Sequence, residues 1–291
     1  MASSQFMTFS DPKQLAALYS NASFRSLCRP DRDLGSLIDG LSKIDCSQKK
    51  GHTVRSLLKI GYDQLLQNYR HEYVFKTALF KDFILSNYAL ENSILLNEFK
   101  IGRSIADTVL VNGTNKVFEI KTELDSPFRL DSQIGDYKKV FSEVYLVVHY
   151  SQAEKYAKII SSEIGLLCFS EFQGFSRYKE AKVDNSQLEI TTMAKTLRKE
   201  ELILLATVLN GDTPIATPVK LFNTCLDIIK NFSAEQVQKE YLKIIKRRIR
   251  PNVNEKVLSN QIPSFLKFFC YTENIKEKDY IHLLNSLELT F

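Results

Sequence analysis

The sequence has no apolar run approaching the roughly 18 residues of a membrane span. Its first fifteen residues lack both the basic segment and the apolar core of a signal peptide. We therefore expect a cytoplasmic protein without membrane contact. The five cysteines are odd in number, widely spaced and without a CxxC pair, which excludes a disulfide framework and argues against a zinc site. None of the four histidines has metal-ligand spacing to another.

Several enzyme motifs are also missing. No G-x-x-x-x-G-K-[ST] sequence occurs, so any ATP-driven motor would be a separate protein. No G-x-S-x-G sequence or cysteine and histidine pairing supports another class of hydrolase. The composition, 44% hydrophobic and 25% charged, is that of a folded globular protein, and the net charge of +5 suits a polyanionic partner without requiring one.

Residues 69–190 alternate between helical and strand-like patterns. An apolar stripe predicts a helix from His71 to Tyr88. Period-2 or continuous apolar runs predict strands at 93–101, 104–111, 116–122, 144–150 and 165–170, with helices near 130–141 and 152–163. Two tight turns make the first three strands an antiparallel meander. The expected class is therefore α/β, a mixed sheet flanked by helices with the core order αβββαβ.

Helical patterns without strand signals lie on both sides of this core. Residues 1–68 hold short helices, with Asp11 and Asp33 as expected N-caps. Residues 191–291 read as all-helical and include a Ser233/Gln236 capping box. We thus expect three regions, 1–68, 69–190 and 191–291. Nothing in the first decides between a DNA-reading module, a partner-docking surface and a helical brace.

The predicted hairpin carries two acids and a lysine. Glu119 and Lys121 are two residues apart on one strand, so they share a face, while Ile120 points the other way. An odd number of loop residues, or a bulge, places Asp107 on that face too; the two-residue turn that Asn112-Gly113 usually indicates places it on the opposite face. The charges are either a solvated ion-pair cluster or a Mg²⁺ site beside a lysine. The second reading predicts a longer loop or a bulge.

The surroundings of this hairpin resemble the PD-(D/E)XK nuclease superfamily, whose core is a helix, a three-strand meander carrying D and (D/E)xK, a helix and a further strand. Gln133 and Tyr137, one turn apart in the next helix, resemble its RecB-like branch. Glu72 and Glu98 match glutamates found in many members. The stretch 69–150 is also similar to small bacterial members of largely unassigned biology.

The resemblance implies a restriction-endonuclease-like core and a Mg²⁺- or Mn²⁺-dependent nuclease acting on DNA. The superfamily's proline is replaced by Ala106. The implied catalytic residues are Asp107, Glu119, Lys121, Gln133 and Glu72. The implied metal ligands are Asp107, Glu119, Glu72 and the main-chain carbonyl of Ile120. Whether Glu72 or Glu98 completes the site is left open.

Basic residues predict where nucleic acid would lie. The helix near 234–250 carries a stripe at intervals of three or four, which is either a solvated face or a phosphate-contacting surface: Lys239, Lys243, Lys246 and Arg250. The expected nucleic-acid-binding residues are Tyr137, Arg129, Lys243, Lys246, Arg247 and Arg250.

The expected function is DNA cleavage in bacterial or phage defence. The alternatives are an RNase or tRNase toxin on the same fold and a catalytically silent nucleic-acid-binding or assembly protein. RNA as the substrate, a protein partner and a homodimer are left open.

Overall fold

A computed structural model describes residues 11–29, 34–44, 51–249 and 253–291. Contacts divide them into two compact units. The first takes the described residues of Met1–Asn87, Glu171–Gly174 and Pro251–Phe291, and the second those of Tyr88–Ser170 and Phe175–Arg250. This grouping differs from the three regions expected from the sequence, which remain a prediction. Within the described ranges, no helix has the length and apolar character that a membrane crossing requires.

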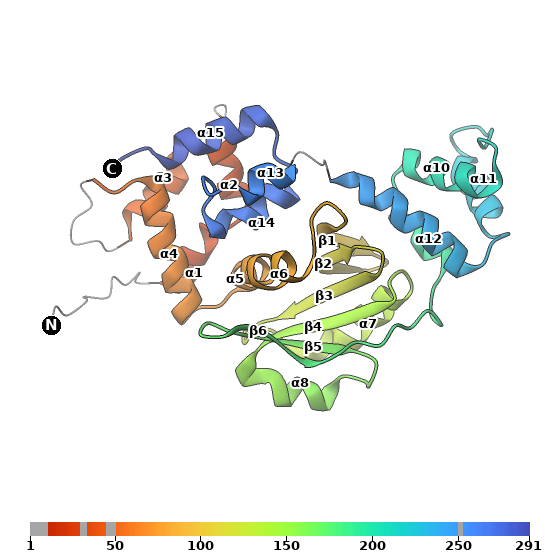
Figure 1. The fold of residues 1–291 in the computed structure, drawn as a ribbon, viewed down its shortest axis with the longest axis horizontal. Helices are drawn as coiled ribbons and strands as arrows, with labels where there is room; N and C mark the ends of the chain where they lie inside the picture. The colour runs from red at the N-terminus through yellow and green to blue at the C-terminus, as the bar shows by residue number, and fades with distance from the viewer. Residues whose placement is uncertain (1–10, 30–33, 45–50, 250–252) are drawn as a thin grey trace. The chain divides into compact units, whose positions relative to one another are not determined.

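The first unit is built from helices (Figure 1). Asp11 caps the first of them as predicted, whereas Asp33 lies outside the described residues. The predicted helix 71–88 forms, but with a π-helical segment in its middle. The elements are α1 (Pro12–Ala17), α2 (Asn21–Cys28), α3 (Gly35–Ser42), α4 (Val54–Asn68), α5 (Glu72–Ala78), the π-helix η1 (Leu79–Ile84), α6 (Leu85–Asn87), α13 (Val253–Leu258), α14 (Ser264–Thr272) and α15 (Glu277–Leu287).

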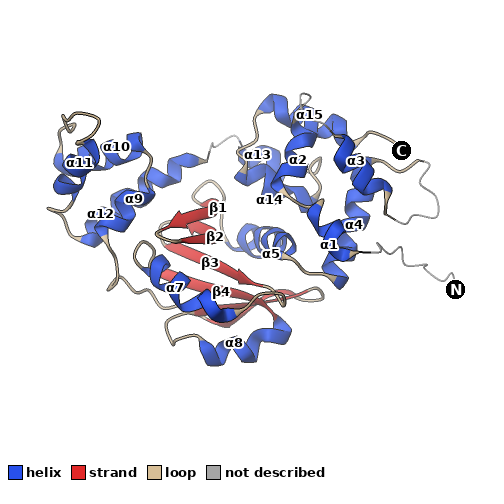
Figure 2. Ribbon diagram, turned by 180° about the vertical axis from the view of Figure 1, so that it is seen from behind, coloured by secondary structure: helices blue, strands red, loops and turns tan. Residues whose placement is uncertain are grey.

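A six-stranded mixed sheet forms the centre of the second unit, with its strands in sequence order (Figures 1 and 2). The strands are β1 (Ile94–Ile101), β2 (Ser104–Val111), β3 (Asn115–Lys121), β4 (Glu143–His149), β5 (Gly165–Ser170) and β6 (Gly174–Lys179). β1, β2 and β3 form the predicted antiparallel meander, and β3, β4 and β5 run parallel. The expected α/β class is confirmed. Strand β6 was not predicted, because none of its residues is buried and they carry no apolar pattern.

Helices cover one face of this sheet. α7 (Leu130–Lys138), preceded by the 3-10 helix η2 (Pro127–Arg129), connects β3 to β4, and α8 (Ala153–Ile159), preceded by η3 (Tyr150–Gln152), connects β4 to β5. Figure 2 shows α7 across the strands. The same hydrophobic core continues into helices from the predicted all-helical region. These are α9 (Ile190–Thr196), α10 (Lys199–Asn210), α11 (Leu221–Ile229), α12 (Ala234–Ile245) and the 3-10 helix η4 (Lys246–Arg248). The capping box that begins α12 is confirmed.

A buried lysine fastens the end of α7. Lys138 Nζ donates to Glu163 at 2.7 Å and lies 3.4 Å from Asp184. The hydrogen bond from Lys138 lowers the pKa of Glu163 from 4.5 to about 2. Since the folded-state pKa is depressed, the stabilisation is present above pH 4.5 and is lost as the pH falls through about 2.

We therefore expect the free energy of unfolding to fall between pH 4.5 and 2, and to fall less steeply in Lys138→Met. Urea unfolding at a series of pH values measures both slopes. The matched control is Lys158→Gln, an exposed lysine on α8, which should leave the slope of the wild type unchanged. Equal slopes in the wild type and in Lys138→Met would contradict the assignment.

Candidate functional site

The loop of the β2–β3 hairpin decides which residues face each other. Val111 pairs with Asn115, so the loop has three residues, with Gly113 at its left-handed position (φ 102°). In this register Asp107 stands opposite Glu119. The longer loop required by the metal-site reading is therefore confirmed, and Asn112-Gly113 does not form a two-residue turn.

Main-chain pairing is interrupted beside Asp107. The β2–β3 ladder ends with Thr108 and Phe118, and two residues further along β3 the Ile120 N–H donates to the Asp107 Oδ2 at 2.7 Å. On the other side, the β1–β2 ladder pairs the neighbours of Asp107 but skips it. The carboxylate thus takes a place that main-chain hydrogen bonds occupy elsewhere in the sheet.

The residue opposite Asp107 on β1 is strained. Glu98 has φ 52°, in the left-handed region that costs a residue with a side chain about 1 kcal/mol. We expect Glu98→Gly to raise the free energy of unfolding by about 1 kcal/mol. Lys100→Gly, at an exposed position of the same strand without positive φ, should lower it by about 0.5–1 kcal/mol. Denaturant unfolding compares the two, and a loss of stability in both would exclude strain at Glu98.

Glu119 is the centre of a buried hydrogen-bond network. Its side chain accepts from three donors: Lys121 Nζ at 2.8 Å and Gln133 Nε2 at 2.6 Å on Oε1, and the Tyr137 hydroxyl at 2.6 Å on Oε2. Lys121 also donates to Gln133 Oε1 at 2.9 Å. Glu119 is 2% exposed and Lys121 is 7% exposed. The reading of these charges as a solvated surface pair is therefore wrong, and buried charges of this kind gather at functional sites.

Tyr137 is fully buried beneath this network. Burial raises the pKa of its hydroxyl, and the neighbouring Glu119 carboxylate raises it further, so the group stays protonated and acts as a donor. It also lies 2.9 Å from the main-chain oxygen of Ile105, and its single proton serves one acceptor at a time. This position is at odds with the predicted contact to nucleic acid. The side chain instead orients Glu119.

Asp136, which the sequence did not single out, fixes α7 against the β1–β2 turn. It accepts hydrogen bonds from Ser104 Oγ at 2.8 Å and from the Arg103 N–H at 3.2 Å. Desolvation opposes its ionisation, but these bonds and one from Lys139 hold its pKa below the usual value. The turn comes so close that a Cβ on Gly102 would lie 3.0 Å from Asp136 Oδ1. This anchor sets the position of α7, and with it that of Gln133 and Tyr137.

Comparison with known proteins identifies the family. The family described as bacteriophage P4 protein cII matches residues 66–268. The chain belongs to this family. Protein cII of Enterobacteria phage P4 is 25% identical over 181 residues, which are 61% of this chain and 66% of that protein, just under two thirds of its length.

A solved structure is also similar to part of this cII-family protein. It is the SPO1766 protein of unknown function from Silicibacter pomeroyi, with 19% identity and a TM-score of 0.26, covering 32% of this chain and 62% of that one. A likeness this low carries no argument. The family match, by contrast, includes every residue of the Glu119 network.

Glu72 lies in the first unit of this cII-family protein. Its carboxylate forms an ion pair with Lys76 one turn later on α5. The prediction that it joins Asp107 and Glu119 remains a prediction.

The predicted basic residues fall in two places. Arg129 is exposed at the start of α7, one turn before Gln133. Lys243 pairs with Glu240 at 2.7 Å, and both Lys243 and Lys246 line a cavity whose lining also includes Asn115, the first residue of β3. Arg247 follows Lys246 in η4 and is not part of this lining. Lys243 and Lys246 are thus near the end of β3 opposite to Lys121. Arg250 lies outside the described residues.

The oxygen donors of the site suit a hard divalent cation. The described residues contain no cluster of three or more histidine, cysteine or acidic side chains able to hold a metal. Mg²⁺ needs fewer, because it keeps several waters and is commonly held by one or two carboxylates. Asp107, Glu119 and the Ile120 carbonyl match that donor set. Glu119 accepts three hydrogen bonds, and a carboxylate offers about four lone-pair sites, so roughly one remains on Oε2.

Proposed function

We propose that this protein is a metal-dependent phosphodiesterase that cleaves DNA, with a restriction-endonuclease-like core whose sheet lies in the second unit. The observation that most supports this proposal is the buried ion pair of Glu119 with Lys121 on β3. It lies opposite Asp107, where the main-chain pairing of β2 is interrupted. Desolvating two charges costs several kcal/mol per ion, and a purely structural sheet has no need of it. The arrangement therefore supports catalysis over a silent binding or assembly protein.

Each residue of the network has a role in this proposal. Asp107, Glu119 and the Ile120 carbonyl would hold Mg²⁺ or Mn²⁺, which supplies a Lewis acid and a water of lowered pKa when bound. Lys121 places its ammonium beside the Glu119 carboxylate, where it stabilises negative charge developing on the phosphate. Gln133 accepts from Lys121 and donates to Glu119, which fixes both side chains.

The substrate and the setting are inferred from Arg129 and from the family. Arg129 is exposed one turn from Gln133 and is suited to contact the phosphate backbone. No feature of the described residues distinguishes DNA from RNA as the substrate, so an RNase on the same fold is the second candidate. The family takes its name from a phage protein, which supports a role in conflict between phage and bacterial genomes inside the cytoplasm.

Cleavage assays test the proposal. We expect the purified protein to cut plasmid, linear duplex or single-stranded DNA in Mg²⁺ or Mn²⁺, and to lose this activity with EDTA, in Asp107→Ala and in Lys121→Ala. RNA in parallel tests the second candidate. Cleavage that persists in both variants would place the chemistry elsewhere, and absence of cleavage on all four substrates would favour a silent protein.

A further inference from the structure

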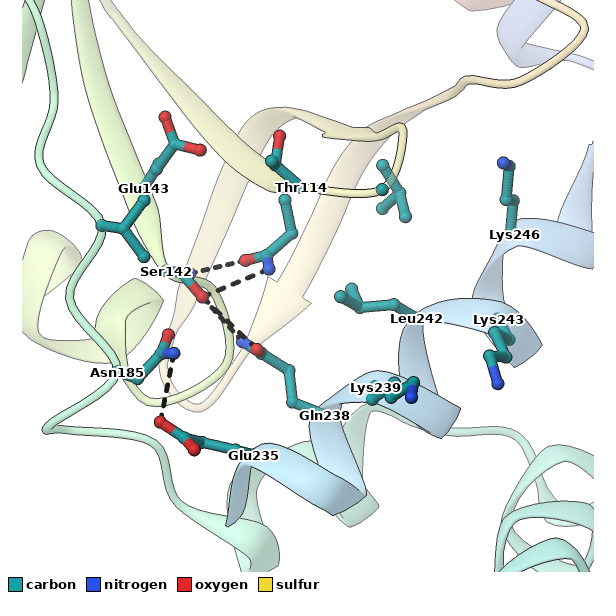
Figure 3. Close-up of a pocket in the computed structure, with 14 residues that line it drawn as sticks. Thr114, Ser142, Glu143, Asn185, Glu235, Gln238, Lys239, Leu242, Lys243 and Lys246 are labelled. Atoms are coloured by element: carbon teal, nitrogen blue, oxygen red, sulfur yellow. Dashed lines mark hydrogen bonds between the residues drawn. The ribbon is translucent and has the colours of Figure 1, made fainter.

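A second candidate site lies in the same unit, away from the Glu119 network. A cavity of about 550 Å³ opens between the β2–β3 loop, the start of β4, the segment near Asn185 and helix α12 (Figure 3). Its lining includes Asn115, the first residue of β3. Four residues of strand, roughly 13 Å at 3.3 Å per residue, separate Asn115 from Glu119. The cavity is therefore a distinct place on the sheet.

The inner end of the cavity is a fixed polar surface. The Ser142 N–H donates to Asn115 Oδ1 at 2.5 Å, and Asn115 Nδ2 donates to Ser142 Oγ at 3.2 Å. Gln238 Nε2 donates to the Val140 carbonyl at 2.8 Å and lies 3.2 Å from the same Ser142 hydroxyl. Asn115, Ser142 and Gln238 are all buried. Such a network holds its side chains in place before any ligand arrives.

One wall of the cavity is cationic. Lys239, Lys243 and Lys246 follow one another at helical spacing, and Figure 3 shows them on the α12 side, away from Glu143 and Asn185. Lys243 pairs with Glu240, but within the described parts of the chain neither Lys239 nor Lys246 makes an ion pair. These two ammonium groups are available to an anion.

The remaining walls combine apolar and acceptor groups. Val111, Val183 and Leu242 supply apolar surface. Glu143 is neutralised by Lys116 at 2.5 Å, whereas among the described residues Glu235 accepts a single hydrogen bond, from Asn185 at 3.3 Å. A ligand that fits has an anionic end for the lysines, an apolar flat part, and N–H donors for Glu235.

We propose that this cavity binds a nucleoside monophosphate, with its phosphate on Lys239 and Lys246 and its base between Leu242, Val183 and Glu235. The volume is in the range of roughly 300–1,000 Å³ typical of small-ligand sites. A free nucleotide and one nucleotide of a strand share this chemistry. The inference does not depend on the nuclease proposal, since it involves none of the residues around Glu119.

Fluorescence tests the site directly. The chain has no tryptophan, so Val183→Trp at the exposed rim places a single reporter beside the expected base. AMP, GMP, CMP, UMP, inorganic phosphate and a ten-residue oligothymidylate are titrated into this variant in EDTA, which keeps any metal-dependent cleavage out of the assay. We expect at least one mononucleotide to bind, about tenfold more weakly once Lys239→Gln, Lys243→Gln and Lys246→Gln are combined.

The control arms separate the sources of binding. Lys158→Gln, an exposed lysine on α8, should bind as the unaltered protein does. Binding of the oligonucleotide alone, with the same lysine dependence, would support the site and identify a strand as its source. Binding of inorganic phosphate as tight as that of every nucleotide would overturn the role of the base. No response to any probe, or an unchanged affinity in the triple lysine variant, would overturn the proposal.

Discussion

Asp107→Asn should abolish metal-dependent cleavage without altering the fold. The asparagine Oδ1 can still accept the hydrogen bond from the Ile120 N–H, so the junction between β2 and β3 is preserved. What is lost is the negative charge, and with it a metal ligand that a neutral amide replaces poorly. Several kcal/mol of transition-state stabilisation correspond to a loss of about a thousandfold in the cleavage rate. Initial rates on plasmid DNA at saturating Mg²⁺ measure it.

Two further variants make this result specific. Asp107→Ala removes the acceptor as well, and an unsatisfied buried N–H costs about 1–3 kcal/mol, so this variant should lose both activity and stability. Asp131→Asn, an exposed acid on α7, has the same change in charge and should retain full activity. Retention of cleavage in Asp107→Asn at any Mg²⁺ concentration would remove Asp107 from the metal site.

The positions of Asp107, Glu119 and Lys121 were within reach of the sequence. Strand periodicity places Glu119 and Lys121 on one face of the sheet. Whether Asp107 shares that face depends on whether the hairpin loop has an odd or an even number of residues. The sequence signal for that loop pointed the wrong way, because Asn-Gly is the strongest sign of a two-residue turn. The metal-site hypothesis instead required an odd number of loop residues or a bulge, and the loop has three residues. Here the loop length required by the metal-site hypothesis agrees with the structure, whereas the length indicated by the local turn signal does not.

The features that the sequence did not show depend on which other elements pack against each helix or strand. Spacing put Gln133 and Tyr137 on one face of a helix, but not which of them would be buried, and Tyr137 proved to be internal. Likewise, the lysine spacing on α12 did not indicate a cavity beside it. Asp136 acts through the main chain of a distant turn and leaves no motif. These are long-range contacts that only the packed sheet and helices create.

Glu119→Ala should destabilise the second unit by about 3–5 kcal/mol, the cost expected when one partner of a buried ion pair is removed. The substitution would leave the Lys121 ammonium, 7% exposed, with only the Gln133 oxygen as a described partner, and the Tyr137 hydroxyl with only the Ile105 carbonyl. Denaturant unfolding followed by circular dichroism measures the loss. Lys138→Met, which breaks a separate buried pair in the same unit, gives the scale for comparison.

The double variant Glu119→Leu/Lys121→Met distinguishes stability from function. Replacing a buried ion pair with apolar side chains of similar volume is often neutral or stabilising, so this variant should recover most of the stability lost in Glu119→Ala. It should nevertheless be inactive, because it lacks a metal ligand and the ammonium. A stable, inactive double variant would indicate that the buried pair is retained for chemistry. A double variant as unstable as Glu119→Ala would indicate instead that the pair holds the sheet to α7, and the catalytic role would lose its main support.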